Sequence, residues 1–111
     1  MKEDKTGKVQ LASFVRKKIQ EGSLDTNGCG HFSQINDVTP SAVGCEECLK
    51  MGDEWVHLRL CLTCGHVGCC DNSKNKHATK HFHATSHPVI VSYEPDERWL
   101  WCYPDRAVIE I

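Results

Sequence analysis

Hydrophobic positions near the N-terminus recur at the spacing of a helix. They are Leu11, Phe14, Val15 and Ile19. Basic residues fall between them and Gly22 opens a polar stretch, so the pattern predicts a short amphipathic helix that ends near Gly22. We expect residues 1–28 to form an N-terminal tail in which this helix packs on the body or frays. The alternative is a basic helix that docks on a partner or a membrane surface.

The body of the chain shows the alternation of half-buried strands. From residue 56 to residue 60 every second position is aliphatic, while Trp55, His57 and Arg59 alternate with them, which predicts a strand over residues 55–60. Apolar runs predict further strands, the last two joined in a hairpin across Pro104 and Asp105. These strands are expected over residues 88–93, 98–103 and 107–111.

One helix and two turns are predicted between these strands. Residues 75–83 have the composition of a helix, with Ser73 as its N-cap. Residues 49–53 are interpreted as a turn, and the two glycines in residues 65–68 as the source of close backbone turns. The elements together predict an α+β fold, with a twisted antiparallel sheet and one or two helices.

Composition changes this picture, because a chain of 111 residues with 7% aromatic residues has a thin hydrophobic core. Eight cysteines and seven histidines indicate what reinforces it. Cysteines alone would fit a disulfide framework, but histidine adds nothing to disulfides, whereas mixed sulfur and nitrogen ligands suit zinc. The N-terminal stretch is polar and lacks the apolar run of a signal peptide or a membrane span, so we expect a reducing, cytoplasmic location.

Two Cys-x-x-Cys pairs carry the strongest zinc signal. They are Cys45 with Cys48 and Cys61 with Cys64. Each pair needs two more ligands for a tetrahedral site, and four candidates follow at suitable reach. These are Cys69 or Cys70, His77, His81 and His87. The count predicts two zinc ions, but the residues alone leave open how the ligands are paired and which of the adjacent cysteines is used.

A third zinc site is predicted from residues near both ends of the body. Cys29 and His31 form a short pair, and Cys102 lies near the C-terminus. Asp105 stands three residues further on, where its carboxylate would be an acceptable zinc ligand. The alternative is that both cysteines are buried thiols and that Asp105 caps the hairpin turn. The expected cofactor is therefore Zn²⁺, with two ions and a third at this site.

The remaining residues argue against two classes of protein. His57, His66 and His83 are interpreted as surface or hydrogen-bonded side chains. The histidines near the spare thiol are used by metal, so a cysteine hydrolase is not expected. In residues 21–111 thirteen acidic residues face seven basic ones, which disfavours nucleic acid as a partner.

Five motifs follow one another across residues 29–111. They are Cys29-x-His31, Cys45-x-x-Cys48, Cys61-Leu-Thr-Cys64-Gly-His-Val-Gly-Cys69, His77-x3-His81-x5-His87-Pro88 and Trp101-Cys102-Tyr103. Together they resemble the UBP-type zinc finger, the ubiquitin-binding module of some deubiquitinating enzymes and deacetylases. The chain is especially similar to the short stand-alone bacterial members. The resemblance implies a small zinc-stabilised domain over residues 29–111.

The resemblance also implies the ligand set of each zinc site. One ion would be held by Cys45, Cys48, Cys69 and His77. A second would be held by Cys61, Cys64, His81 and His87. A third would use Cys29, His31 and Cys102, with Asp105 in place of the family's usual fourth cysteine.

A ligand pocket is a further implication of the resemblance. Ubiquitin-binding members take a free C-terminal Gly-Gly tail, with an arginine just after the Cys69-type ligand and aromatic residues over the peptide. Trp101 and Tyr103 match the aromatic positions, and Trp55 matches more loosely. The arginine position reads Cys70-Asp71, and an acid there would repel a carboxylate, which disfavours ubiquitin itself.

The sequence therefore predicts a non-catalytic, zinc-binding interaction module without a membrane span. Its partner is expected to be a peptide or a protein C-terminus, held in a pocket. The pocket residues would be Trp55, Arg59, Asp71, Trp101 and Tyr103. The alternative function is a redox or metal-responsive protein that uses the spare cysteine thiol.

Overall fold

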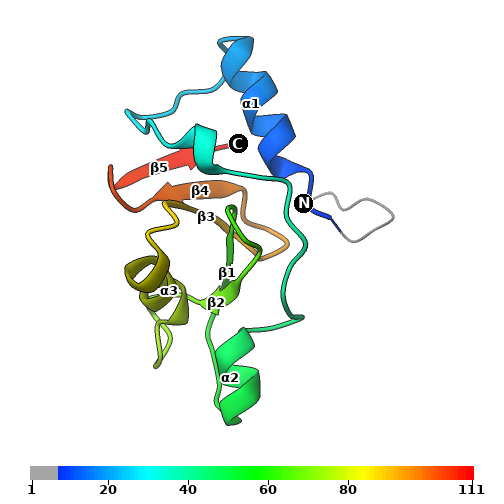
Figure 1. Ribbon diagram of the computed structural model, residues 1–111, viewed down its shortest axis with the longest axis vertical. Coiled ribbons are helices and arrows are strands. Elements are labelled where there is room, and N and C mark those ends of the chain that lie inside the picture. Colours follow the sequence, from blue (N-terminus) through cyan, green and yellow to red (C-terminus); the bar gives the residue numbers. More distant parts are fainter. Residues whose placement is uncertain (1–7) are drawn as a thin grey trace.

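The structure is a computed structural model that describes residues 8–111. Helices and strands are interspersed along this part of the chain, which confirms the α+β class (Figure 1). The helices are α1 (Leu11–Gln20), the 3-10 helix η1 (Phe32–Gln34), α2 (Glu46–Met51) and α3 (His77–Thr85). The strands are β1 (Leu58–Cys61), β2 (Val67–Cys69), β3 (Val89–Ser92), β4 (Trp99–Cys102) and β5 (Ala107–Glu110).

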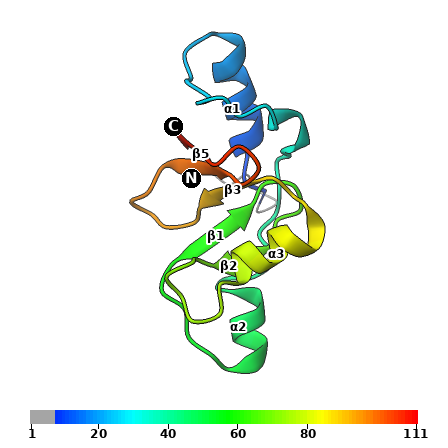
Figure 2. The ribbon, with the colours of Figure 1, turned by 90° about the vertical axis from the view of Figure 1, so that its left-hand side faces the viewer.

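The five strands form one antiparallel sheet in the order β2-β1-β3-β4-β5. Leu60 lies opposite Val91, and Leu100 lies opposite Ile109. All four side chains are buried, because residues opposite one another in neighbouring strands point to the same face. This face carries the core. Figures 1 and 2 place α1 at one end of the sheet, beside β5, and α2 at the other, beside β2.

Helix α1 packs on the body of the protein. Val9, Ala12 and Val15 are fully buried and belong to the same hydrophobic cluster as the sheet residues. The backbone N–H of Val9 also donates a hydrogen bond of 2.7 Å to the carbonyl oxygen of Val38. Thus the predicted amphipathic helix is present, and its apolar face supplies core surface that a chain with so few aromatic residues needs.

Helix α2 occupies the segment that the sequence interprets as a turn, and it raises the number of α-helices in residues 8–111 to three, where one or two were predicted. It is only six residues long, too short to show a helical period. Glu46 and Glu47 in its first turn suit the positive end of the helix dipole. Gly52 ends it in the left-handed conformation, at φ 70°. The favourable charges in its first turn and the glycine at its C-terminus therefore stabilise this helix, although its sequence has no amphipathic pattern that would predict it.

Three other boundaries differ from the sequence predictions. Residues 55–57 are outside β1, and Val56 is exposed instead of facing the core. Residues 67–69 form β2, where only close turns were predicted. Helix α3 begins at His77, and Ser73 is not its cap. The Ser73 hydroxyl instead accepts a hydrogen bond of 2.9 Å from the Val56 backbone, which holds residues 55–57 away from the sheet.

Within residues 8–111, none of the helices has both the length and the apolar content needed to cross a bilayer.

Candidate metal centres and binding pocket

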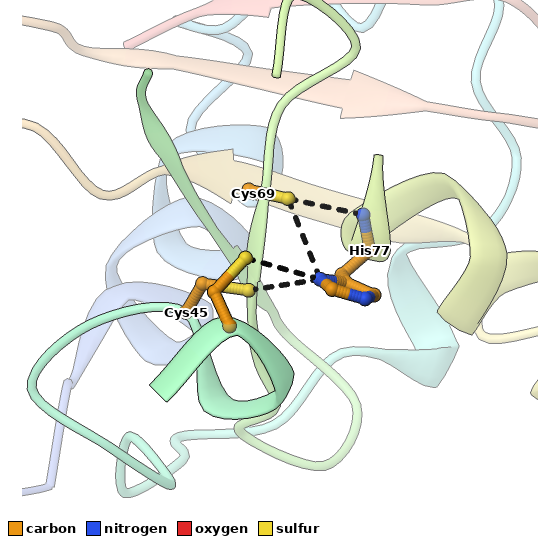
Figure 3. A group of neighbouring side chains, drawn as sticks. Cys45, Cys69 and His77 are labelled. Atoms are coloured by element: carbon orange, nitrogen blue, oxygen red, sulfur yellow. Dashed lines mark hydrogen bonds between the residues drawn. The ribbon is translucent and has the colours of Figure 1, made fainter. Parts of the chain in front are cut away.

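The first cluster of metal-ligating side chains, cluster A, lies between α2, β2 and α3 (Figure 3). It contains Cys45, Cys48, Cys69 and His77. The Nδ1 atom of His77 lies 3.2 Å from the sulfur of Cys45, 3.4 Å from that of Cys48 and 3.6 Å from that of Cys69. The three thiols are buried. Cys69 also accepts the backbone N–H of His77 at 3.2 Å, a bond typical of a thiolate at a helix start.

The second cluster, cluster B, joins the end of β1 to α3 and to the segment that enters β3. It contains Cys61, Cys64, His81 and His87. Cys61 Sγ lies 3.6 Å from His87 Nδ1, and Cys64 Sγ lies 3.3 Å from His81 Nε2. Clusters A and B therefore interleave along the chain, because Cys69 and His77 of cluster A lie between the cysteines and histidines of cluster B.

The third cluster, cluster C, connects the segment after α1 to the last hairpin. It contains Cys29, His31, Cys102 and Asp105. His31 Nδ1 lies 3.3 Å from Cys102 Sγ and 2.8 Å from Asp105 Oδ2. The backbone N–H of Gly30 donates to the same carboxylate oxygen at 3.1 Å. This hydrogen bond holds the pKa of Asp105 below its usual range, so the carboxylate is ready to act as an anionic ligand.

All three clusters fit a tetrahedral zinc ion. Zinc–sulfur and zinc–nitrogen bonds of about 2.3 and about 2.0–2.1 Å place ligand atoms about 3.3–3.8 Å apart. In each cluster the four ligand atoms lie within 4.8 Å of one another, and the sulfur–nitrogen distances in cluster A are 3.2–3.6 Å. The eight cysteines all fall in the described part of the chain and are all free. The donor sets of clusters A and B, sulfur with nitrogen, are those of structural zinc sites, and cluster C adds the carboxylate oxygen of Asp105, which is also an acceptable zinc ligand.

Burial keeps several of these thiols protonated in the metal-free chain. It raises the pKa of Cys45 to about 12, that of Cys61 to about 11 and that of Cys102 to about 12, with neighbouring thiols adding to the effect. Only the thiolate binds zinc, so metal binding must release these protons. Without the metal, the clusters would be groups of buried thiols with few stabilising interactions between them, so we expect the metal-free fold to be less stable.

Acidification is expected to destabilise the protein through His81. In the metal-free chain, burial, and then the proximity of His66 and His87, lowers the pKa of His81 from 6.5 to about 4, and a proton on this ring would equally compete with a zinc ion in cluster B. Below pH 6.5 the unfolded chain therefore binds a proton that the folded chain rejects, so stability is present above this pH and is lost as the pH falls toward 4. Urea unfolding at about pH 7.5 and about pH 5 measures the change. His83→Gln, at an exposed position, should show the same decrease, whereas equal stability at both pH values would contradict the prediction.

His66 links clusters A and B. Its ring stacks on that of His81 in cluster B at 4.0 Å, and its Nε2 atom lies 2.8 Å from both carboxylate oxygens of Glu47. Glu47 stands between Cys45 and Cys48 in α2. His66 is buried and hydrogen-bonded, as one of the two sequence interpretations has it, but with Glu46 and Glu47 it also forms a fourth group whose atoms could hold a metal ion. Neither His57 nor His83 is in a cluster of metal-ligating residues in the described chain.

A cavity of about 340 Å³ lies beside cluster A, on the face of the sheet opposite the core. The outward residues of four strands form its floor, and the loop after β2 together with the first turns of α3 forms its wall. Arg59, Asp71, Trp101 and Tyr103 line it, so the structure brings together four of the five predicted pocket residues. The other lining residues are Cys70, Asn72, Ala78, Thr79, Ile90, Trp99, Val108 and Glu110.

Trp55, the fifth predicted pocket residue, does not line this cavity. Its ring packs directly against Gly44 and the hydrophobic core. Trp99 and Glu110 line the cavity instead, and the sequence interpretation did not include them. The alternation of β4 contained the signal for Trp99, because residues 99 and 101 must share a face of a strand. Glu110 lies opposite Trp99 in β5, a pairing that depends on register.

The two adjacent cysteines have different positions. Cys69 points into cluster A, whereas Cys70 lines the cavity, with its sulfur 3.5 Å from the Ser73 hydroxyl. Of the two cysteines that the sequence left open, the structure thus groups Cys69, the last residue of β2, with the other ligand candidates, and Cys70, the residue after the strand, with the cavity lining.

These observations define a class of protein, a small α+β module built around clusters that can bind zinc. The family described as "Zn-finger in ubiquitin-hydrolases and other protein" matches residues 45–110. The chain therefore belongs to the UBP-type zinc-finger family, as the sequence motifs indicated, and it contains a zinc-binding module.

The chain is similar to a short part of two much longer curated proteins and to most of a bacterial protein of known structure. Ubiquitin carboxyl-terminal hydrolase 16 of Rattus norvegicus is 42% identical over 101 residues, which is 84% of this chain and 11% of that protein. Histone deacetylase 6 of Caenorhabditis elegans is 30% identical over 80 residues, or 68% of this chain and 8% of that protein. The chain thus spans about a tenth of these curated relatives.

One similar solved structure is that of protein RPA1320 from Rhodopseudomonas palustris, determined by solution NMR. It is 64% identical to this chain, with a TM-score of 0.69. The match covers 75% of this chain and 81% of that one. The similarity therefore extends over most of a small stand-alone protein.

Proposed function

We propose that this chain is a non-catalytic binding module in which clusters A, B and C each hold one structural zinc ion. The observation that carries this proposal is the number of ligands, because each cluster supplies four and so closes a tetrahedral site without an open position for a substrate or water. Zinc would supply folding free energy by linking distant parts of the chain. The hydrolase and deacetylase activities in the relatives' names belong to proteins of which this chain matches only 11% and 8%.

Asp105→Ala is expected to remove one zinc ion and leave the other two bound. The substitution deletes one of the four ligands of cluster C and a hydrogen-bond acceptor for Gly30, but it touches neither cluster A nor cluster B. Native mass spectrometry should give one zinc ion fewer than in the unsubstituted chain. Asp105→Cys, which restores a sulfur ligand, should keep the full number. An unchanged zinc count in Asp105→Ala would rule out this carboxylate as a ligand.

The cavity beside cluster A is proposed as the site that binds a peptide or the end of a protein chain. Its volume of about 340 Å³ is within the range of small ligand sites. Aromatic side chains and a few polar groups line it, a composition typical of recognition pockets. Arg59 is the residue that could contact a terminal carboxylate, but its Nη1 atom already donates to Glu97 at 3.3 Å.

Peptide binding can be followed by tryptophan fluorescence, since two tryptophans line the cavity. Short acetylated peptides that end in Gly-Gly, as free acids and as amides, are expected to change the emission of the unsubstituted protein. Trp101→Ala should lose the response and Trp55→Phe should keep it, because Trp55 lies outside the cavity. Failure of every peptide, or equal binding by Trp101→Ala, would refute this site.

A redox or metal-responsive role is the second candidate, and Cys70 favours it. Burial alone would raise the pKa of this thiol, but hydrogen bonds from Ser73 and from the backbone of His57 and Asn72, together with Arg59, lower it overall. A thiol with a lowered pKa reacts faster with oxidants. Labelling of the native zinc-bound protein with iodoacetamide would test this role, and an inert Cys70 would exclude it.

A further inference from the structure

The charges around the cavity favour a positively charged ligand. Asp71 and Glu110 both line it and are both exposed. Arg59 is the one lysine or arginine among the described lining residues. Its guanidinium group forms an ion pair of 3.3 Å with Glu97 and lies 4.6 Å from the centre of the Trp99 ring. The cation of the pocket is thus already compensated, whereas the two carboxylates have no cationic partner among the described contacts.

Two aromatic rings form a corner inside the cavity. The rings of Trp101 and Tyr103 are perpendicular, with an interplanar angle of 82° and 6.3 Å between their centres. Tyr103 is fixed by the ring of Phe82, which stacks on it at 4.4 Å, and by the Thr79 hydroxyl, 3.3 Å from its own. Rigid aromatic walls of this kind attract a cation through the negative faces of the rings.

Asp71 is held beside this corner. The Thr79 hydroxyl donates a hydrogen bond of 2.6 Å to Asp71 Oδ1, and the same hydroxyl is the neighbour of Tyr103. Glu110 lines the same cavity further along the sheet, because β5 places it opposite Trp99 and two residues from Val108, the partner of Trp101. A ligand group at the corner would therefore lie beside two aromatic rings and the Asp71 carboxylate, with the Glu110 carboxylate in the same cavity.

We propose that this corner binds the cationic side chain of a lysine or arginine in a peptide ligand, and that it rejects a carboxylate at the same place. The inference rests on the proposed peptide-binding function of the cavity and specifies the chemistry of its ligand. A carboxylate would be repelled by Asp71 and Glu110, and it could pair with Arg59 only in competition with Glu97. An ammonium or guanidinium group gains from both carboxylates and from the rings.

Three acetylated and amidated tetrapeptides of the form Gly-X-Gly-Gly test the proposal, with lysine, norleucine or glutamate at X. Norleucine has nearly the length of lysine without its charge. Titrations followed by tryptophan fluorescence and by amide NMR shifts should give the lysine peptide an affinity roughly tenfold above norleucine and the glutamate peptide the lowest affinity. Added salt should reduce the preference for lysine, because the carboxylates are exposed.

Charge-neutral variants locate the effect. Asp71→Asn keeps an acceptor for Thr79, and Glu110→Gln keeps the shape of the side chain. Each should lower lysine-peptide affinity by about twofold to fivefold and leave norleucine binding unchanged. Asp96→Asn is the matched control, because it removes the same charge at an exposed position outside the cavity and should have no effect. The zinc content of each variant should equal that of the unsubstituted protein.

The outcomes separate the two proposals. Equal affinities for the lysine, norleucine and glutamate peptides would overturn the cation preference and leave the peptide site intact. Tightest binding by the glutamate peptide would also overturn it and would assign the selectivity to Arg59. If none of these three amidated peptides binds, the cation preference fails, and the free-acid Gly-Gly peptides then decide whether the proposed peptide site fails as well.

Discussion

Cys69→Ser is expected to lose one zinc ion and to unfold, whereas Cys70→Ser is expected to keep its zinc and its fold. Cys69 is fully buried and is a proposed ligand in cluster A, which joins α2, β2 and α3. A structural zinc site contributes an apparent free energy of about 10–16 kcal/mol in zinc-finger peptides at neutral pH. Since the whole stability of a small domain is about 5–15 kcal/mol, loss of the ion that joins these three elements should be enough to unfold the protein. Loss of the ion of cluster C frees only the segment after α1 from the last hairpin, so it should leave clusters A and B folded.

Cys70 is the matched control because it is adjacent, buried and of the same residue type, but its sulfur contacts the Ser73 hydroxyl instead of a metal cluster. Circular dichroism and zinc analysis of the two purified variants provide the comparison. If Cys69→Ser stayed folded with a full complement of zinc, or if Cys70→Ser lost an ion, the assignment of cluster A would be wrong.

The second large effect is a loss of stability on substitution of Gly65, which lies between Cys64 of cluster B and β2. Gly65 has a φ of 86°, and a Cβ there would lie 2.2 Å from the carbonyl oxygen of Thr39. The carbonyl oxygen of Gly65 also accepts a hydrogen bond of 2.8 Å from the backbone N–H of Ser41. This bond holds the segment of Thr39 and Ser41 against Gly65, so the backbone cannot easily move apart to relieve a clash. Gly65→Ala should therefore cost at least about 3 kcal/mol, from left-handed strain of about 1–2 kcal/mol plus this clash.

Gly52→Ala is the control that separates the cost of backbone strain from the cost of the clash with Thr39. Gly52 has a similar φ of 70° but no atom within 4 Å of the position that a Cβ would occupy. It should lose only the strain, about 1–2 kcal/mol. Urea unfolding of both variants with zinc present measures the difference, and equal losses would show that the approach of Thr39 to Gly65 has no energetic weight.

The grouping of the candidate zinc ligands was predictable from the sequence because metal coordination needs a few residue types at short spacings. The two Cys-x-x-Cys pairs and the histidines of α3 are such local patterns, and the family resemblance supplied the pairing between them. The structure groups the same twelve residues in the same three sets. Asp105 joins cluster C because the β4–β5 turn brings it within 3.5 Å of Cys102, as the spacing suggested.

The sequence was less informative where the outcome depends on distant contacts. In the sequence, Trp55 continues the alternation of β1. In the structure, residues 55–57 lie outside the sheet, and the backbone of Val56 donates a hydrogen bond to the Ser73 hydroxyl instead. Glu110 and Trp99 become neighbours only through the register of β4 and β5. The net charge of the cavity lining could therefore not be predicted from the sequence. Asp71 alone already indicated that the pocket would repel a carboxylate.

Native mass spectrometry of the unsubstituted protein, purified under reducing conditions, tests the central claim most directly. Clusters A, B and C together predict a folded species with three bound zinc ions and eight free thiols after the metal is removed. The claim would be contradicted by a folded protein that carries no zinc, or by one in which cysteines of these clusters are joined in disulfides.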